Sequence, residues 1–166
     1  MTNHTEVAAA VIEGYRRAGW QIVAAESLTG GALSDALVSV PGASDVFLGS
    51  VVAYSNRLKH SLLGVPEAVL ESVGAVSPQS AEAMAYGARR LLGQPSNTLV
   101  AISTTGVAGP ATQDGRAVGT VYLGLDSAHG AALEHFQFSG DRSAIRGQAV
   151  ERALKLLLAH LEANQN

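Results

Sequence analysis

A strand-to-helix turn near the start of the chain constrains its fold more than any other segment. The apolar run Gln21–Ala25 predicts a buried strand, and the periodicity of Gly31–Val40 predicts a helix. The residues between them are Glu26-Ser27-Leu28-Thr29-Gly30. A hydroxyl at such a turn faces the unpaired N–H groups of the helix start, so Ser27 can act as a nucleophile beside an oxyanion site. A purely structural interpretation also stands, in which Ser27 or Thr29 caps the helix and the glycines form a tight turn.

The remaining patterns predict one α/β domain. Helices alternate with strands early in the chain, and two strands close in sequence follow late. Helical patterns cover Thr5–Ala18, Asn56–Leu63, Pro66–Val73, Pro78 to about Leu92 and Asp141–Leu161, and strand-like runs cover Val46–Tyr54, Asn97–Ser103, Gly119–Leu125 and Ala132–Phe138. We expect a three-layer α/β/α sandwich whose mixed sheet has helices on both faces. No repeat or linker divides residues 1–166, so we expect a single domain.

Charge and cysteine content exclude several classes of function. The formal net charge is −3 and charged residues make up only 15%, which gives no electrostatic footprint for nucleic acid. The absence of cysteine excludes disulfides and thiolate chemistry, so covalent catalysis must use oxygen or nitrogen. No apolar run approaches the ~20 residues that span a bilayer, and no signal peptide is recognisable. We therefore expect a cytoplasmic protein without a membrane partner.

A glycine-rich segment, Thr104–Gly119, interrupts the regular alternation of elements. We predict a loop of about 16 residues here, longer than the usual connection of 4–6 residues. Its glycines would let backbone N–H groups approach a phosphate or a carboxamide, and Thr105, Gly106 and Gly109 are candidates to cradle a ribose or a phosphate. A surface connector without a function is the alternative.

A serine nucleophile needs a base, and the histidines do not supply an obvious one. None of the five lies at a position typical of a catalytic triad, and no spacing of His, Asp or Glu is typical of a metal site. A lysine can replace histidine if burial lowers its pKa. The chain has two lysines. Lys155 lies among leucines on the last predicted helix and is interpreted as a snorkelling surface residue. Lys59 follows a strand end, where catalytic groups of α/β proteins gather, although composition alone favours a surface lysine.

Several motifs in order resemble the CinA C-terminal-domain family, over about residues 5 to 162. The resemblance is carried by Ala25–Gly31, Pro41–Ser44, Val51–Lys59, Leu62–Val65, Gly74–Ser77, Thr105–Pro110, Val118–Tyr122 and Gly140–Arg146. Members of this family include amidohydrolases that convert nicotinamide mononucleotide to nicotinate mononucleotide and ammonia. The resemblance therefore implies an α/β/α fold and a small nucleotide substrate. We expect neither a cofactor nor a metal. The resemblance also implies self-association into a homo-oligomer.

The resemblance assigns catalytic roles to three residues. Ser27 would attack the carboxamide carbon, and Lys59, neutral in its pocket, would take the Ser27 proton. Tyr54 would relay or orient that proton.

Other residues are predicted to bind the substrate. Backbone N–H groups of Thr29, Gly30 and Gly31 are candidates for the oxyanion site. Arg142 and Arg146, four residues apart on one helix face, offer guanidinium groups for the nucleotide phosphate, with a solvated helix start as the alternative.

Two other functions remain open. The chain could bind a nucleotide or a partner without catalysis, as a module of the competence and damage-inducible type, or it could hydrolyse another amide. It departs from the family pattern at Leu28, Ser50, Ala111 and Ala117, and none of these changes removes a side chain that the chemistry needs.

Overall fold

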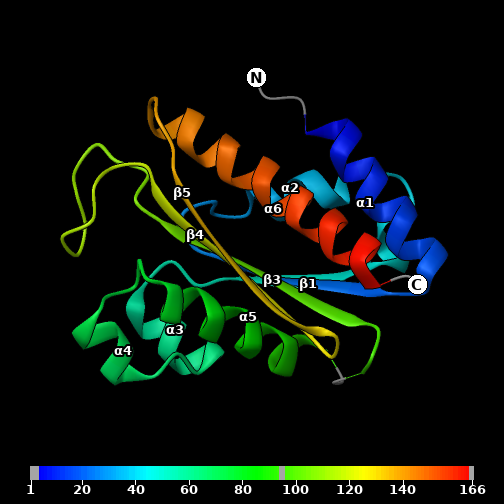
Figure 1. Cartoon of the computed structure of the whole chain (residues 1–166), viewed down its shortest axis with the longest axis horizontal. Helices are drawn as coiled ribbons and strands as arrows, with labels where there is room; N and C mark the ends of the chain where they lie inside the picture. The colour runs from blue at the N-terminus through cyan, green and yellow to red at the C-terminus, as the bar shows by residue number, and fades with distance from the viewer. Residues whose placement is uncertain (1–3, 94–95, 165–166) are drawn as a thin grey trace.

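A five-stranded mixed sheet forms the centre of the computed structural model, which describes residues 4–93 and 96–164. The strand order is β2-β1-β3-β4-β5 (Figure 1). β1 runs parallel to both β2 and β3, whereas β3–β4 and β4–β5 are antiparallel pairs. The predicted mixed sheet is thus confirmed. The strands are β1 (Gln21–Glu26), β2 (Phe47–Val52), β3 (Leu99–Gly106), β4 (Thr120–Ser127) and β5 (Gly130–Gln137).

Helices cover both faces of this sheet, as expected for an α/β/α sandwich (Figure 1). One layer contains α1 (Thr5–Ala18), α2 (Ala32–Val38) and α6 (Arg142–Asn164), and the other contains α3 (Asn56–Leu63), α4 (Glu67–Ser72) and α5 (Pro78–Leu92). Within the described parts of the chain, no helix is both long and apolar enough to cross a bilayer.

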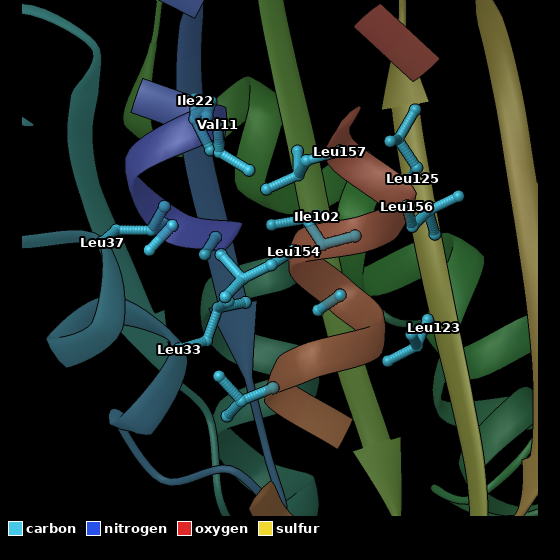
Figure 2. Packing of buried hydrophobic residues seen from close by; sticks show 14 of the residues in the cluster. Val11, Ile22, Leu33, Leu37, Ile102, Leu123, Leu125, Leu154, Leu156 and Leu157 are labelled. Atoms are coloured by element: carbon cyan, nitrogen blue, oxygen red, sulfur yellow. The ribbon is translucent and has the colours of Figure 1, made fainter. Parts of the chain in front are cut away.

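The two layers have separate hydrophobic cores because side chains alternate along the strands. In β1, Ile22 and Ala24 belong to the core beneath α1, α2 and α6, and Val23 and Ala25 belong to the core beneath α5. Figure 2 shows Ile22 and other strand residues packed against the leucines of α2 and α6. Since β1 is buried on both faces, its register is firmly fixed, and so is the position of the turn that follows it.

Two glycines bring α5 unusually close to its neighbours. A Cβ on Gly87 would lie 1.9 Å from the carbonyl oxygen of Leu63, at the end of α3. A Cβ on Gly124 of β4 would lie 2.5 Å from the carbonyl oxygen of Ala81. Because neither contact could accommodate a side chain, α5 packs tightly on the sheet and holds α3 in place.

Some element boundaries differ from the sequence prediction. β3 continues to Gly106, so Thr104 and Thr105 belong to the strand, and the connecting loop is only 107–119. The prediction of a loop from Thr104 was wrong because these polar residues pair with β4, where Thr104 faces Leu123. A cross-strand partner overrides a sequence that lacks the apolar signal of a strand.

Candidate active site

Ser27 lies at the carboxyl end of β1, in the turn that leads into α2. Its backbone N–H donates to the carbonyl oxygen of Thr104 on the neighbouring strand at 3.0 Å. The residue is buried, with 7% of its surface exposed. Gly30 and Gly31 complete the turn with φ angles of 58° and 98°, a conformation that glycine adopts without strain. The predicted strand-to-helix turn is therefore present.

Glu26 caps the helix after this turn. Its fully buried carboxylate accepts the backbone N–H groups of Gly31 at 2.9 Å, Leu33 at 3.1 Å and Ser34 at 2.9 Å. These donors are the unpaired N–H groups of the α2 start, and they compensate the charge of the carboxylate. The structural interpretation of Ser27 or Thr29 as the helix cap is therefore wrong. The N-cap is Gly31, and Glu26 does the capping, so the Ser27 hydroxyl is free for another contact.

Lys59 makes that contact. It lies on α3, which Ser55 caps by accepting the N–H of Leu58. The lysine Nζ is 3.0 Å from Ser27 Oγ, and Lys59 is 2% exposed. Nζ also donates to the carbonyl oxygens of Ala53 at 2.9 Å and Tyr54 at 3.3 Å. The fold thus joins two residues that are 32 positions apart in the sequence.

The surroundings of Lys59 shift its protonation equilibrium toward the neutral amine. Burial lowers the pKa of Lys59 from 10.5 to about 8, and the negative charge of Asp114 raises it in part. A neutral amine has two N–H donors and one lone pair. The two backbone carbonyls can accept both donors, which directs the lone pair toward Ser27 Oγ. This arrangement can take a proton from the serine hydroxyl.

Ser27 opens into a small cavity of about 110 Å³. Five further segments complete its walls: the residue after β2, the segment before α5, the end of β3, the 107–119 loop and the start of α6. The residues that line the cavity are Ser27, Leu28, Tyr54, Ala75, Val76, Thr105, Gly106, Val107, Ala108, Gly109, Ala111, Gln113 and Arg142. Of the predicted binding residues, Thr105, Gly106, Gly109 and Arg142 therefore lie at this cavity. A larger hollow of about 860 Å³ lies between α1, α2 and α6 and contains neither Ser27 nor Lys59.

Arg142 and Tyr54 meet at the mouth of the cavity. The Arg142 guanidinium donates to the Tyr54 hydroxyl at 2.8 Å and to the carbonyl oxygen of Gly109 at 2.7 Å. Tyr54 is 59% exposed, and its contact with Lys59 is made by its backbone carbonyl. In this conformation the tyrosine hydroxyl is directed toward Arg142, which is not the relay geometry that the sequence predicts.

Arg146 has a different place. Its guanidinium donates to the carbonyl oxygens of Leu28 at 2.9 Å and Thr29 at 2.8 Å, so it braces the turn that carries Ser27. Arg146 does not line the Ser27 cavity. Arg142 and Arg146 are thus held by different backbone carbonyls, and their predicted role at a phosphate stays a prediction.

The predicted oxyanion donors need a correction as well. The N–H of Gly30 donates to the Ser27 carbonyl at 3.1 Å, and that of Gly31 donates to Glu26. These two groups are occupied by the turn itself, whereas the N–H of Thr29 remains a candidate. The Thr29 hydroxyl is 2.7 Å from the Thr104 hydroxyl and is fully buried, so it ties the turn to β3.

Sequence reasoning missed two contributors to the site. Ala75 and Val76 form a wall of the cavity, and Asp114 acts on the Lys59 pKa. The sequence does mark Asp114-Gly115 as a turn, but nothing in it indicates which group the aspartate contacts. Across residues 4–93 and 96–164, no three His, Asp or Glu side chains gather in a way that could hold a metal ion.

The fold and the site together define an α/β/α protein with a serine and a buried lysine in contact at the end of its central parallel strands. More particularly, the chain belongs to the CinA C-terminal domain family, whose model matches residues 4–161.

Solved structures and curated relatives agree with this assignment. The competence/damage inducible protein CihA from Agrobacterium tumefaciens is 33% identical, with a TM-score of 0.89 over 98% of this chain and 97% of that one. A CinA superfamily protein from Klebsiella pneumoniae is 30% identical, with a TM-score of 0.91 over 98% and 99% of the two chains. A CinA-like protein of Solibacter usitatus is 45% identical over 82% of this chain and 32% of its own length. The chain thus spans about a third of the length of the curated relatives it matches.

Proposed function

We propose that this protein hydrolyses the carboxamide of nicotinamide mononucleotide to nicotinate mononucleotide and ammonia, with Ser27 as the nucleophile and Lys59 as the base. One observation carries the chemistry: Lys59 Nζ is 3.0 Å from Ser27 Oγ in a buried setting. The substrate is what the resemblance of the motifs implies for a member of this family.

In the first half of the reaction, Ser27 Oγ bonds to the carboxamide carbon while its proton passes to Lys59 Nζ. The tetrahedral intermediate then collapses, the C–N bond breaks, and the ammonium form of Lys59 returns the proton to the departing nitrogen. Ammonia and a nicotinoyl ester on Ser27 result. In the second half, Lys59 takes a proton from water, whose oxygen attacks the ester carbon. The C–O bond to Ser27 then breaks, the ammonium form of Lys59 returns the proton to Ser27 Oγ, and the acid is released.

The volume of the cavity supports a small amide. Its volume of about 110 Å³ suits one aromatic ring with its carboxamide, so the ribose and phosphate would remain at the mouth. Arg142 lies at that mouth, and a guanidinium group suits a phosphate. Arg142 would have to exchange its contact with Tyr54 or with Gly109 to bind the phosphate.

A substrate panel tests the proposal. Ammonia release is measured with nicotinamide mononucleotide, nicotinamide and NAD, with the Ser27→Ala variant as the blank. We expect release from the mononucleotide that depends on Ser27. Binding without ammonia release would instead identify a catalytically silent nucleotide-binding module. Release from another amide alone would retain the mechanism and overturn the substrate.

A further inference from the structure

The loop between β3 and β4 carries an acidic side chain that the proposed mechanism does not use. Asp114 and Gly115 form the corner of a turn whose flanking residues, Gln113 and Arg116, are paired. The φ angles at the corner are 49° and 71°, and positive φ at both positions is what a type I′ turn requires. Asp-Gly is a favoured sequence for this turn. The turn accounts for the backbone of Asp114 and leaves its carboxylate available for a contact elsewhere.

That contact lies on a wall of the Ser27 cavity. The carboxylate of Asp114 accepts the backbone N–H of Ala75 at 3.2 Å, and Thr105 Oγ1 donates to the carbonyl oxygen of Ala75 at 2.7 Å. Ala75 and its neighbour Val76 line the cavity. A Cβ on Gly74 would lie 2.8 Å from the Asp114 side chain, so the close approach requires glycine at this position. The segment before α5 is therefore held between β3 and the loop.

The same carboxylate is the charge that acts on Lys59. The pKa of Lys59 falls to about 8 through burial, and the Asp114 charge opposes this fall. The carboxylate of Glu26 is engaged by the α2 start, and Arg142 is engaged by Tyr54 and Gly109. The other charged or titratable groups on α3, α4, α5 and the loop are Arg57, His60, Glu67, Glu71, Glu82, Tyr86, Arg89, Arg90 and Arg116.

We propose that Asp114 is a positioning residue for this site, which latches the 107–119 loop onto Ala75 and places a negative charge within electrostatic reach of Lys59. Opening the latch would loosen one wall of the cavity and withdraw that charge in a single movement. This inference rests on the proposed function only for its kinetic consequences, because both of its physical consequences can be measured without turnover.

Two variants separate the latch from the charge. Asp114→Asn removes the charge, retains an oxygen that can accept the Ala75 N–H, and tolerates a positive φ. Asp114→Gly removes the acceptor as well and adopts a positive φ without strain. Asp45→Asn is the matched control, because Asp45 is an exposed aspartate in the short helix Ala43–Asp45. This helix precedes the amino-terminal end of β2, at the sheet edge opposite the site.

The effect of the Asp114 charge on Lys59 is measured by titrating the lysine side chains. The chain has two lysines, so ¹³C labelling of lysine gives two Cε signals, and Lys155→Arg identifies which is which. Titration at about 10 mM ionic strength avoids most screening. We expect the Lys59 signal to titrate at a lower pH in both Asp114 variants than in the wild type. The Lys155 signal, and both signals in Asp45→Asn, should not move.

The latch is read from the backbone amide of Ala75 by hydrogen exchange. Exchange should be about three- to tenfold faster in Asp114→Gly, which corresponds to the loss of one hydrogen bond, and close to wild type in Asp114→Asn. In kinetics, the acidic limb of the pH profile of kcat/KM should move to lower pH in Asp114→Asn, and KM should rise in Asp114→Gly.

Two results would overturn the inference. An unchanged Lys59 titration in Asp114→Asn would disprove the electrostatic role, and unchanged Ala75 exchange in Asp114→Gly would disprove the latch. If the wild type hydrolyses no nicotinamide mononucleotide while both physical shifts occur, the proposed function fails and the role of Asp114 stands.

Discussion

The two lysines of this chain lie on helices of opposite layers and have opposite surroundings. Lys59 is 2% exposed, and its hydrogen-bond partners are a hydroxyl and two backbone carbonyls. The Lys155 side chain is 48% exposed and forms an i,i+4 ion pair with Glu151 at 2.6 Å. Such a surface pair contributes only about 0.3–0.5 kcal/mol. Burial beside neutral partners turns one lysine into a candidate base, while the other stays an ordinary surface cation.

The contacts around α3 support Lys59 in its buried position. A buried ammonium is costly unless it is hydrogen-bonded on all sides, and the turn after β2 offers the carbonyls of Ala53 and Tyr54 for this purpose. The close contact of Gly87 with Leu63 fixes the far end of the same helix. The buried environment of Lys59 is thus supported by close contacts at both ends of α3, as a preorganised site requires.

The largest expected effect concerns the partner of Lys59. Ser27→Ala should lower ammonia release from nicotinamide mononucleotide by about 10⁴- to 10⁶-fold, because it removes the nucleophile. The circular dichroism spectrum should match that of the wild type, and nucleotide binding measured by calorimetry should be largely retained. Ser61→Ala, an exposed serine on the same helix as Lys59, is the control. Activity of Ser27→Ala within a few-fold of the wild type would end the serine mechanism.

The second prediction exchanges each lysine for arginine. Lys59→Arg keeps a positive charge that cannot be given up near neutral pH, so turnover should fall by about 10²- to 10⁴-fold, nearly as much as in Lys59→Ala. Lys155→Arg should leave kcat and KM close to the wild type. If Lys59→Arg retained most of its turnover, Lys59 would be an electrostatic anchor, and Tyr54 would be the next candidate for the base.

The third prediction concerns the free energy of unfolding that is lost by burying the Lys59 ammonium. The pKa of Lys59 is about 8 in the folded protein and 10.5 without burial, so between these values the unfolded state binds more protons. The free energy of unfolding of the wild type should therefore rise with pH across this window, relative to Lys59→Met, by up to about 3 kcal/mol. Urea unfolding at pH 7.5 and pH 10.5 measures the difference in unfolding free energy. We expect the slope of this free energy with urea concentration, the m value, to be about 1–3 kcal/mol per molar.

Lys155→Met provides the reference for this experiment, because Lys155 is exposed and lies in the opposite layer. Equal slopes for Lys59→Met and Lys155→Met would mean that the two lysines titrate alike in the folded protein. The different burial of the two lysines would then have no effect on how the free energy of unfolding depends on pH.

Local signals predicted much of the fold. Ser77-Pro78 marks the start of α5, and the structure places Ser77 at the N-cap, where its hydroxyl accepts the N–H of Ser80. The order of the strands was not predictable, because it depends on contacts between segments far apart in the sequence. The extension of β3 to Gly106 was missed for the same reason, since only pairing with β4 makes this polar stretch a strand.

The site was predicted in its residues more than in its contacts. The turn pattern and the resemblance indicate Ser27 and Lys59, and the structure brings them together. Arg146 could not be separated from Arg142 in advance, because both lie on one helix face and only the fold shows which carbonyls each one meets. The capping role of Glu26 was hidden as well, since a side chain six positions before the first residue of α2 is not a standard cap position.

The smallest expected effect tests whether the difference between the lysines has a chemical role at all. A serine hydroxyl can be activated by a neighbouring amine or by a bound metal ion. If the amine of Lys59 does this work, exhaustive treatment with a chelator should leave the rate of ammonia release unchanged within error, at any pH where the protein is folded. A loss of activity that a divalent ion restores would contradict the mechanism. Lys59 would then be a buried structural lysine, and its contrast with Lys155 would concern stability and not catalysis.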